Sequence, residues 1–300
     1  MNLFETLSQL KPITAASGSV PTYLMGAFRR KSISFYNGLT DENTIVYWFQ
    51  SKSFTIDLRL KSATDTPITE RQAWVGYTHW DTQTASLSWE LSSNYQNHTQ
   101  WPEPATLHTI GNCILEFSPS NAYVEDWRQQ ASTGLFLGLR LVKAVHVATQ
   151  QKILLDGGLI ICGEHMAYAQ SRLPHIQQNI DALGVLSYVE RSSSDLNQIA
   201  SYEVSVSTQD QLIQYSSCTQ TTQQQLILDG FEIVDAETLI QRKLIGGEAY
   251  QLEFVVDVYE PEYTFQNVTS TTAGSQHWLK QEQHHLMHHA SCSCGRVREL

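Results

Sequence analysis

The chain has 300 residues, of which 41 % are hydrophobic and 16 % are charged, and its formal net charge is −11. This composition is typical of a folded protein, and the length suffices for one large domain or two small ones. The excess of acid disfavours nucleic acids and anionic membrane surfaces as partners, because both are bound by lysines and arginines that face phosphates.

The first 22 residues predict a short amphipathic helix followed by a linker. Apolar side chains recur at helical spacing, at Leu3, Phe4, Leu7 and Leu10. This segment lacks the basic stretch and apolar core of a secretory signal. No apolar run in the chain approaches the roughly 20 residues of a membrane span, so we expect no membrane partner.

The cysteines favour a reducing compartment. Cys113, Cys162 and Cys218 lie singly and far apart inside strand-like segments, and the other two lie near residue 293. An odd count of five in a long chain favours buried thiols over a disulfide framework. We therefore expect a cytoplasmic protein.

Residues 23–147 show the pattern of antiparallel strands. Short runs rich in aromatic and β-branched residues alternate with period two, and clusters of Gly, Asn, Asp and Ser separate them. The runs are SISFYNG, TIVYWFQ, SFTIDLRL, QAWVGYTHW, SLSWELS, NCILEFS, AYVEDW and GLFLGLRLVKAV. Their regular spacing predicts a first β block that folds as a barrel or a sandwich.

Residues 148–262 predict a second β block with one short helix. Gly163 and Glu164 can form a tight turn between LIIC and HMAYA. The segment LPHIQQNIDALG has apolar residues at helical spacing and predicts a helix near residues 173–183. Strand patterns return in ASYEVSVS, QLIQYSS, QQLILDGFEIV and YQLEFVVDVYE.

Residues 263–300 predict a polar linker and a C-terminal helix at 276–290 that is rich in His and Cys. Histidines four residues apart on a helix can hold one metal ion, and nearby thiolates can complete the site. The candidate ligands are His284, His285, His288, His289, Cys292 and Cys294. Imidazole and thiolate suit Zn, Cu or Ni. Three interpretations stay open: a solvated tail that binds metal adventitiously, a metal-handling module and a catalytic metal site.

The order of these segments resembles a lipocalin-like (calycin) family that includes a yeast casein-kinase-interacting protein with two lipocalin-like halves and related bacterial proteins. The matching pieces are VYWFQSKSFTIDLRL at 46–60, WVGYTHW and LSWELSSNYQ within 74–96, YVEDWRQ at 123–129, GLRL at 138–141 and GGLIICGEHMAYAQSR at 157–172. The resemblance implies a mainly β fold with one or two antiparallel lipocalin-like barrels and short peripheral helices. It implies no reaction and does not extend to the His/Cys tail.

The segment SFTIDLRL places Thr55, Asp57 and Arg59 on one face of its strand. A guanidinium beside a carboxylate can hold that carboxylate, or it can hold a polar group of a ligand. Two interpretations remain open here. The residues form either an ion pair on a solvated sheet face or a polar anchor inside a barrel cup.

Six of the seven tryptophans lie between residues 48 and 127, which favours an aromatic-lined cavity in the first block. The candidate ligand-binding residues are Trp48, Gln50, Arg59, Trp74, Trp89 and Arg140. General acid–base chemistry in the same cup would need an imidazole or a carboxyl with a shifted pKa, and the candidates are His79, Glu125 and Asp57.

Three functions follow from these features. The leading one is the binding of a small, partly apolar organic ligand in the aromatic cup, with no cofactor required. The second is an isomerase, hydratase or lyase that works by acid–base chemistry in the same cup. The third is a protein-interaction module with a metal-binding tail, whose partner is another protein or a second copy of the chain.

Overall fold

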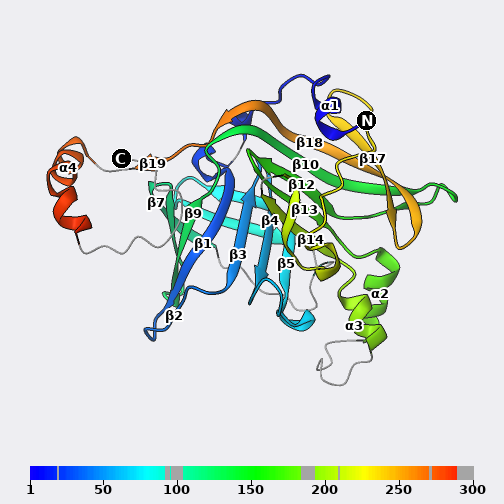
Figure 1. Ribbon diagram of the computed structural model, residues 1–300, viewed down its shortest axis with the longest axis horizontal. Coiled ribbons are helices and arrows are strands. Elements are labelled where there is room, and N and C mark those ends of the chain that lie inside the picture. Colours follow the sequence, from blue (N-terminus) through cyan, green and yellow to red (C-terminus); the bar gives the residue numbers. More distant parts are fainter. Residues whose placement is uncertain are drawn as a thin grey trace.

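The computed structural model describes residues 1–18, 20–91, 95, 104–183, 193–208, 210–269 and 272–288. Two β-sheets make up most of it (Figure 1), and both are antiparallel. The mainly β fold expected from the alternating sequence pattern is confirmed.

The first sheet is a closed barrel of eight antiparallel strands, in the order β7, β6, β5, β4, β3, β1, β9 and β8, and the pairing of β7 with β8 closes it. The strands are β1 (Gly26–Phe35), β3 (Ile45–Gln50), β4 (Phe54–Leu60), β5 (Gln72–Asp81), β6 (Ser86–Leu91), β7 (Ala105–Gly111), β8 (Cys113–Phe117) and β9 (Tyr123–Gln129). Two short strands, β2 (Thr40–Asp41) and β19 (Val268–Thr269), pair with β1 and β7.

The second sheet follows the order β15, β14, β13, β12, β10, β18, β17 and β16, and within the described ranges its two end strands do not pair with each other. Its strands are β10 (Thr133–His146), β12 (Gly157–Cys162), β13 (His165–Gln170), β14 (Glu203–Thr208), β15 (Leu212–Ser216), β16 (Phe231–Ile233), β17 (Thr238–Ile245) and β18 (Glu248–Thr264). The short β11 (Lys152–Ile153) pairs with β10. The second block is therefore an open sheet beside one closed barrel.

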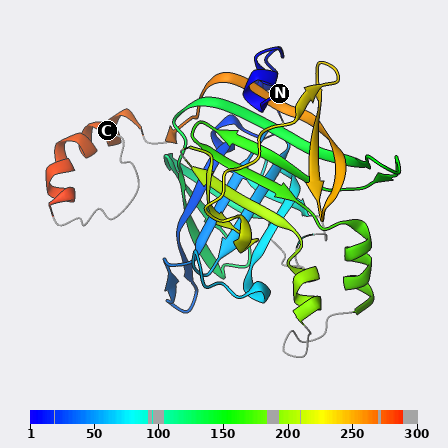
Figure 2. The same ribbon diagram turned by 45° about the vertical axis from the view of Figure 1, so that its right-hand side comes forward.

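Alternation along the strands assigns the two faces of the second sheet to two hydrophobic cores. On β12, Ile160 belongs to the core that includes Phe54 and Ile56 of β4, so this face packs on the outside of the barrel. The next residue, Ile161, belongs to the other core, which includes Leu3. Figure 2 shows the green and orange strands of the second sheet crossing over the blue and cyan strands of the barrel.

The helices lie at the periphery. They are α1 (Leu3–Leu7), α2 (Pro174–Leu183), α3 (Ser193–Ile199) and α4 (Ala273–Met287), with 3-10 turns η1 (Ala15–Ser17), η2 (Thr22–Leu24), η3 (Ile68–Glu70) and η5 (Thr219–Thr221). The helices predicted at the start of the chain, near 173–183 and near 276–290 correspond to α1, α2 and α4. None of the helices in the described part of the chain is long and apolar enough to cross a membrane.

The sheets divide the chain between β9 and β10, whereas the sequence pattern puts the end of the first block at residue 147. The last predicted run of that block, GLFLGLRLVKAV, forms most of β10 and pairs with β12 and β18 of the second sheet. The difference has a simple physical reason, since alternation identifies a strand and its faces but does not specify its partner strand. The division into domains stays a prediction.

Candidate functional site

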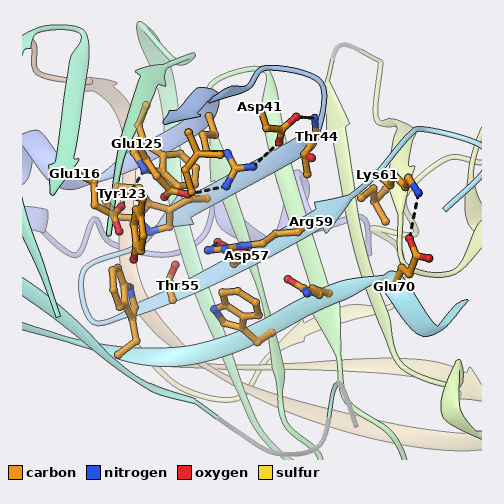
Figure 3. A pocket seen from close by; sticks show the side chains of 18 of the residues that line it. Asp41, Thr44, Thr55, Asp57, Arg59, Lys61, Glu70, Glu116, Tyr123 and Glu125 are labelled. Atoms are coloured by element: carbon orange, nitrogen blue, oxygen red, sulfur yellow. Dashed lines mark hydrogen bonds and ion pairs between the residues drawn. The ribbon is translucent and has the colours of Figure 1, made fainter. Parts of the chain in front are cut away.

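A cavity of about 710 Å³ lies inside the barrel (Figure 3). Its walls come from β1, β3, β4, β5, β6, β8 and β9, and its inner part includes the buried side chains of Trp48, Trp127 and Glu116. Its mouth carries Lys61 and Glu70, whose exposed side chains lie 3.6 Å apart. The cavity is therefore a cup that is open at the end of the barrel where β4 ends and β5 begins.

Because side chains alternate between the two faces of a strand, the polar side chains of β4 point into this cup. Thr55, Asp57 and Arg59 line the cavity, while Phe54 and Ile56 point outward into the core beneath the second sheet. Of the two interpretations of this segment, the geometry matches the one that places its charged residues inside a barrel.

Four tryptophans, at positions 48, 74, 89 and 127, line the cavity. Trp48 stacks on Phe28 with ring centroids 4.8 Å apart and meets Trp127 edge-on at 5.7 Å. The guanidinium of Arg59 lies over the ring of Trp74 at 4.7 Å. Cross-strand pairing explains this cluster, because Trp48, Asp57 and Trp74 are directly opposite neighbours on β3, β4 and β5.

Two arginines are paired with carboxylates inside the cup. Arg59 donates from Nε to Oδ1 of Asp57 at 3.0 Å. Arg30 donates from Nη1 to Glu125 at 2.6 Å and from Nη2 to Asp41 at 3.2 Å. Burial raises the pKa of Asp57 above its ordinary value, because the cost of desolvating the carboxylate outweighs the attraction of Arg59.

Glu116 is the acid of this cluster that forms no ion pair within the described part of the chain. Its Oε2 accepts a hydrogen bond from the indole N–H of Trp127 at 2.9 Å. Its direct cross-strand neighbour is Glu125 of β9, so two carboxyl groups face each other on the inner wall. Burial, with the Glu125 carboxylate adding to it, raises the pKa of Glu116 to about 8.

The structure brings together six of the nine residues predicted for ligand binding or acid–base chemistry in the cup. Trp48, Asp57, Arg59, Trp74, Trp89 and Glu125 all line the cavity. Three predicted residues lie elsewhere. Gln50 is buried and fully used within the barrel, where it accepts hydrogen bonds from Trp48 and Thr78 and donates to the carbonyls of Ser51 and Phe54.

His79 and Arg140 lie outside the cup. His79 is exposed on the outer side of β5, 3.7 Å from the exposed Glu90. Arg140 belongs to β10 of the second sheet, where it pairs with Asp156 and lies over the ring of Tyr77, 4.9 Å from its centroid. Neither residue is in a position to act on a molecule held by Asp57 and Glu125.

The predicted metal ligands lie partly on α4. This exposed helix carries His284 and His285, and His288 caps its C-terminal end. The ring centroids of His284 and His288 are 6.0 Å apart. His289, Cys292 and Cys294 lie outside the described residues. Within the residues that are described, no group of three or more His, Cys, Asp or Glu side chains is arranged to hold a metal ion. A metal site in this tail stays a prediction.

Among the residues of the cup that the sequence pattern does not identify are Arg30 and Glu116. A β-bulge shifts the register of β1 between Arg30 and Ser32, so Arg30 and Ile33 both face the cavity although they are three positions apart. Glu116 carries a weaker signal. It shares a strand face with Ile114 in NCILEFS, yet only the pairing of β8 with β9 shows that this face looks into the cup.

In comparisons with known proteins, no protein-family model and no curated protein matches the chain.

Proposed function

We propose that the barrel binds a small organic ligand with an apolar or aromatic body in its cavity. The observation that carries this proposal is a cup of about 710 Å³ that the side chains of the described residues leave unfilled and that four tryptophans line. Pockets for small molecules have volumes of roughly 300–1,000 Å³ and combine aromatic walls with a few polar groups. A barrel of eight strands is also the size that encloses one small ligand.

The polar groups suit the orientation of a ligand. Arg59 and Asp57 stand on the wall between Trp48 and Trp74, so a ring that stacks on an indole meets a fixed hydrogen-bonding pair at its edge. The resemblance to lipocalin-like barrels supports the same use of the fold. We also propose that the chain belongs to this lipocalin-like family and that the protein is cytoplasmic.

Tryptophan fluorescence tests the proposal, with N-phenyl-1-naphthylamine as a neutral ring probe. We expect saturable quenching of the protein emission and energy transfer to the probe. The variant Trp89→Phe, which alters a cavity wall, should reduce both the affinity for the probe and the energy transfer to it. The variant Trp278→Phe, on the exposed helix α4, should leave the affinity unchanged. Absence of saturable binding by this probe and by a panel of neutral ring compounds would contradict the proposal.

A catalytic role in the same cup is the second candidate, and Glu116 favours it. A carboxyl whose pKa is about 8 can exchange a proton near neutral pH, as a general base or acid must. In this version the reacting groups are Glu116, Glu125 and Asp57. A bound compound that is converted by the wild type and bound but left unconverted by Glu116→Gln would establish catalysis; conversion at equal rates by both would exclude Glu116 from it.

A further inference from the structure

The charged groups around the cavity are unbalanced. The carboxyl groups are those of Asp41, Asp57, Glu70, Glu116 and Glu125, and the bases are Arg30, Arg59 and Lys61. The acids of this wall thus outnumber its bases by two. The net charge of the whole chain is also negative, with a formal value of −11.

Each base of the wall is already held by an acid. Arg59 is paired with Asp57, and Arg30 is shared between Glu125 and Asp41. At the mouth Lys61 lies 3.6 Å from Glu70. An anionic ligand would therefore have to compete with the carboxylates that already hold these bases, and separating a buried pair leaves an uncompensated charge behind.

Glu116 is in the opposite situation. It is 6 % exposed, lines the cavity, and accepts one hydrogen bond, from Trp127, without an ion pair to any base of the described chain. Figure 3 shows it with Tyr123 and Glu125 on one side of the cup, away from Lys61 and Glu70 at the mouth. A buried acid beside aromatic rings offers two favourable contacts to a cation, a charge-assisted hydrogen bond and the faces of indole rings.

We infer that the cup selects a small organic cation, an amine in its ammonium form with an aromatic or apolar body, and that Glu116 is its counter-ion. This inference rests on the proposed function, because it names the charge of the ligand that the cavity takes. The ammonium group would lie at Glu116 on the inner wall, and the apolar body would lie against the indoles of Trp48 and Trp89.

The binding of such a cation depends on pH through Glu116. The charged groups that face it are Glu125 on β9 and Asp57 and Arg59 on β4, with Arg30 of β1 holding Glu125. Its direct cross-strand neighbour on β7 is the apolar Leu107. Because the pKa of Glu116 is about 8, roughly one molecule in ten carries the carboxylate at pH 7 and nine in ten at pH 9. The affinity for an ammonium ion should therefore rise about tenfold over this interval.

Three probes with the same ring and chain length but different charge test the inference: 3-phenylpropan-1-amine, 3-phenylpropan-1-ol and 3-phenylpropanoate. By titration calorimetry at pH 8.5 we expect the amine to bind at least tenfold more tightly than the alcohol, and the acid to bind most weakly. Glu116→Gln should lower the affinity for the amine to that for the alcohol and leave the alcohol unchanged. The control Glu90→Gln, on the outer side of β6, should change neither.

The outcomes separate this inference from the proposed function. If the alcohol or the acid binds as tightly as the amine, or if Glu116→Gln leaves the affinity for the amine intact, the charge selection is wrong and the binding cup stands. If none of the three probes binds while N-phenyl-1-naphthylamine does, the inference fails and the binding cup stands. If N-phenyl-1-naphthylamine and the neutral ring compounds also fail to bind, the proposed function fails with it. Should Glu116→Gln not fold, the wild type alone decides: an amine affinity that does not rise between pH 7 and pH 9 overturns the inference.

Discussion

The clearest physical consequence of the cup is a pH-dependent free energy of unfolding that originates at Glu116. In the folded chain its carboxyl has a pKa of about 8, raised from an ordinary value of 4.5. Between these values the folded state holds a proton that the unfolded state has released, so the folded state binds more protons and its stability falls as pH rises. The contribution is fully present below pH 4.5 and is lost as pH passes through about 8.

The size of this effect follows from the shift. A difference of one pKa unit corresponds to about 1.4 kcal/mol, so the loss of stability from this group is on the order of 4 to 5 kcal/mol between acid and alkaline pH. Glu116→Gln removes the titrating group and keeps an acceptor for the indole N–H of Trp127. We expect the variant to match the wild type in stability near pH 5 and to exceed it by several kcal/mol at pH 9.

Urea unfolding at pH 5, 7 and 9, followed by tryptophan fluorescence, measures this difference. The relevant quantity is the gap between the two free energies of unfolding at each pH, because groups remote from Glu116 contribute equally to both proteins. Glu90→Gln serves as the control, since Glu90 is exposed on the outside of the barrel. Parallel curves for Glu116→Gln and the wild type across this range, or a variant that is less stable at pH 9, would refute the reasoning.

Two further predictions concern the construction of the barrel and of the second sheet. Arg30→Met should lower the free energy of unfolding in urea by about 3–5 kcal/mol, because it leaves the buried carboxylate of Glu125 unpaired. The double variant Arg30→Met with Glu125→Leu should recover most of that loss. An unaltered stability of the single variant would argue against a buried pair. Gly163→Ala should destabilise the protein by about 1–3 kcal/mol, because Gly163 has a φ of +60° and an added Cβ would lie 2.8 Å from the carbonyl oxygen of Thr133. A thermal unfolding midpoint equal to that of the wild type would exclude this strain.

The sequence predicts those parts of the fold and site that depend on local order. The hairpin turn at Gly163 and Glu164 and the helix α2 follow from turn chemistry and helical spacing, and both occur in the structure. The side-by-side position of Asp57 and Arg59 follows from period-two alternation alone. In each case, residues close in the chain determine the geometry.

The parts that could not be predicted depend on pairing between distant strands. The role of Arg30 is hidden by a bulge that interrupts the alternation of β1. Glu116 becomes part of the site because β8 pairs with β9 and places it opposite Glu125. Arg140, which the sequence pattern places in the cup, lies in the second sheet for the same reason, since its strand pairs with β12 and β18.

The central claim is that a ligand binds inside the barrel, and a pair of substitutions on β5 tests it most directly. Gln72 lines the cavity, whereas His79 is exposed on the outer side of the same strand. Gln72→Trp adds bulk to the cavity wall and His79→Trp adds the same ring outside it. In titrations with N-phenyl-1-naphthylamine we predict that Gln72→Trp weakens binding at least tenfold and that His79→Trp leaves it unchanged; equal affinities in both folded variants would contradict binding in the cup.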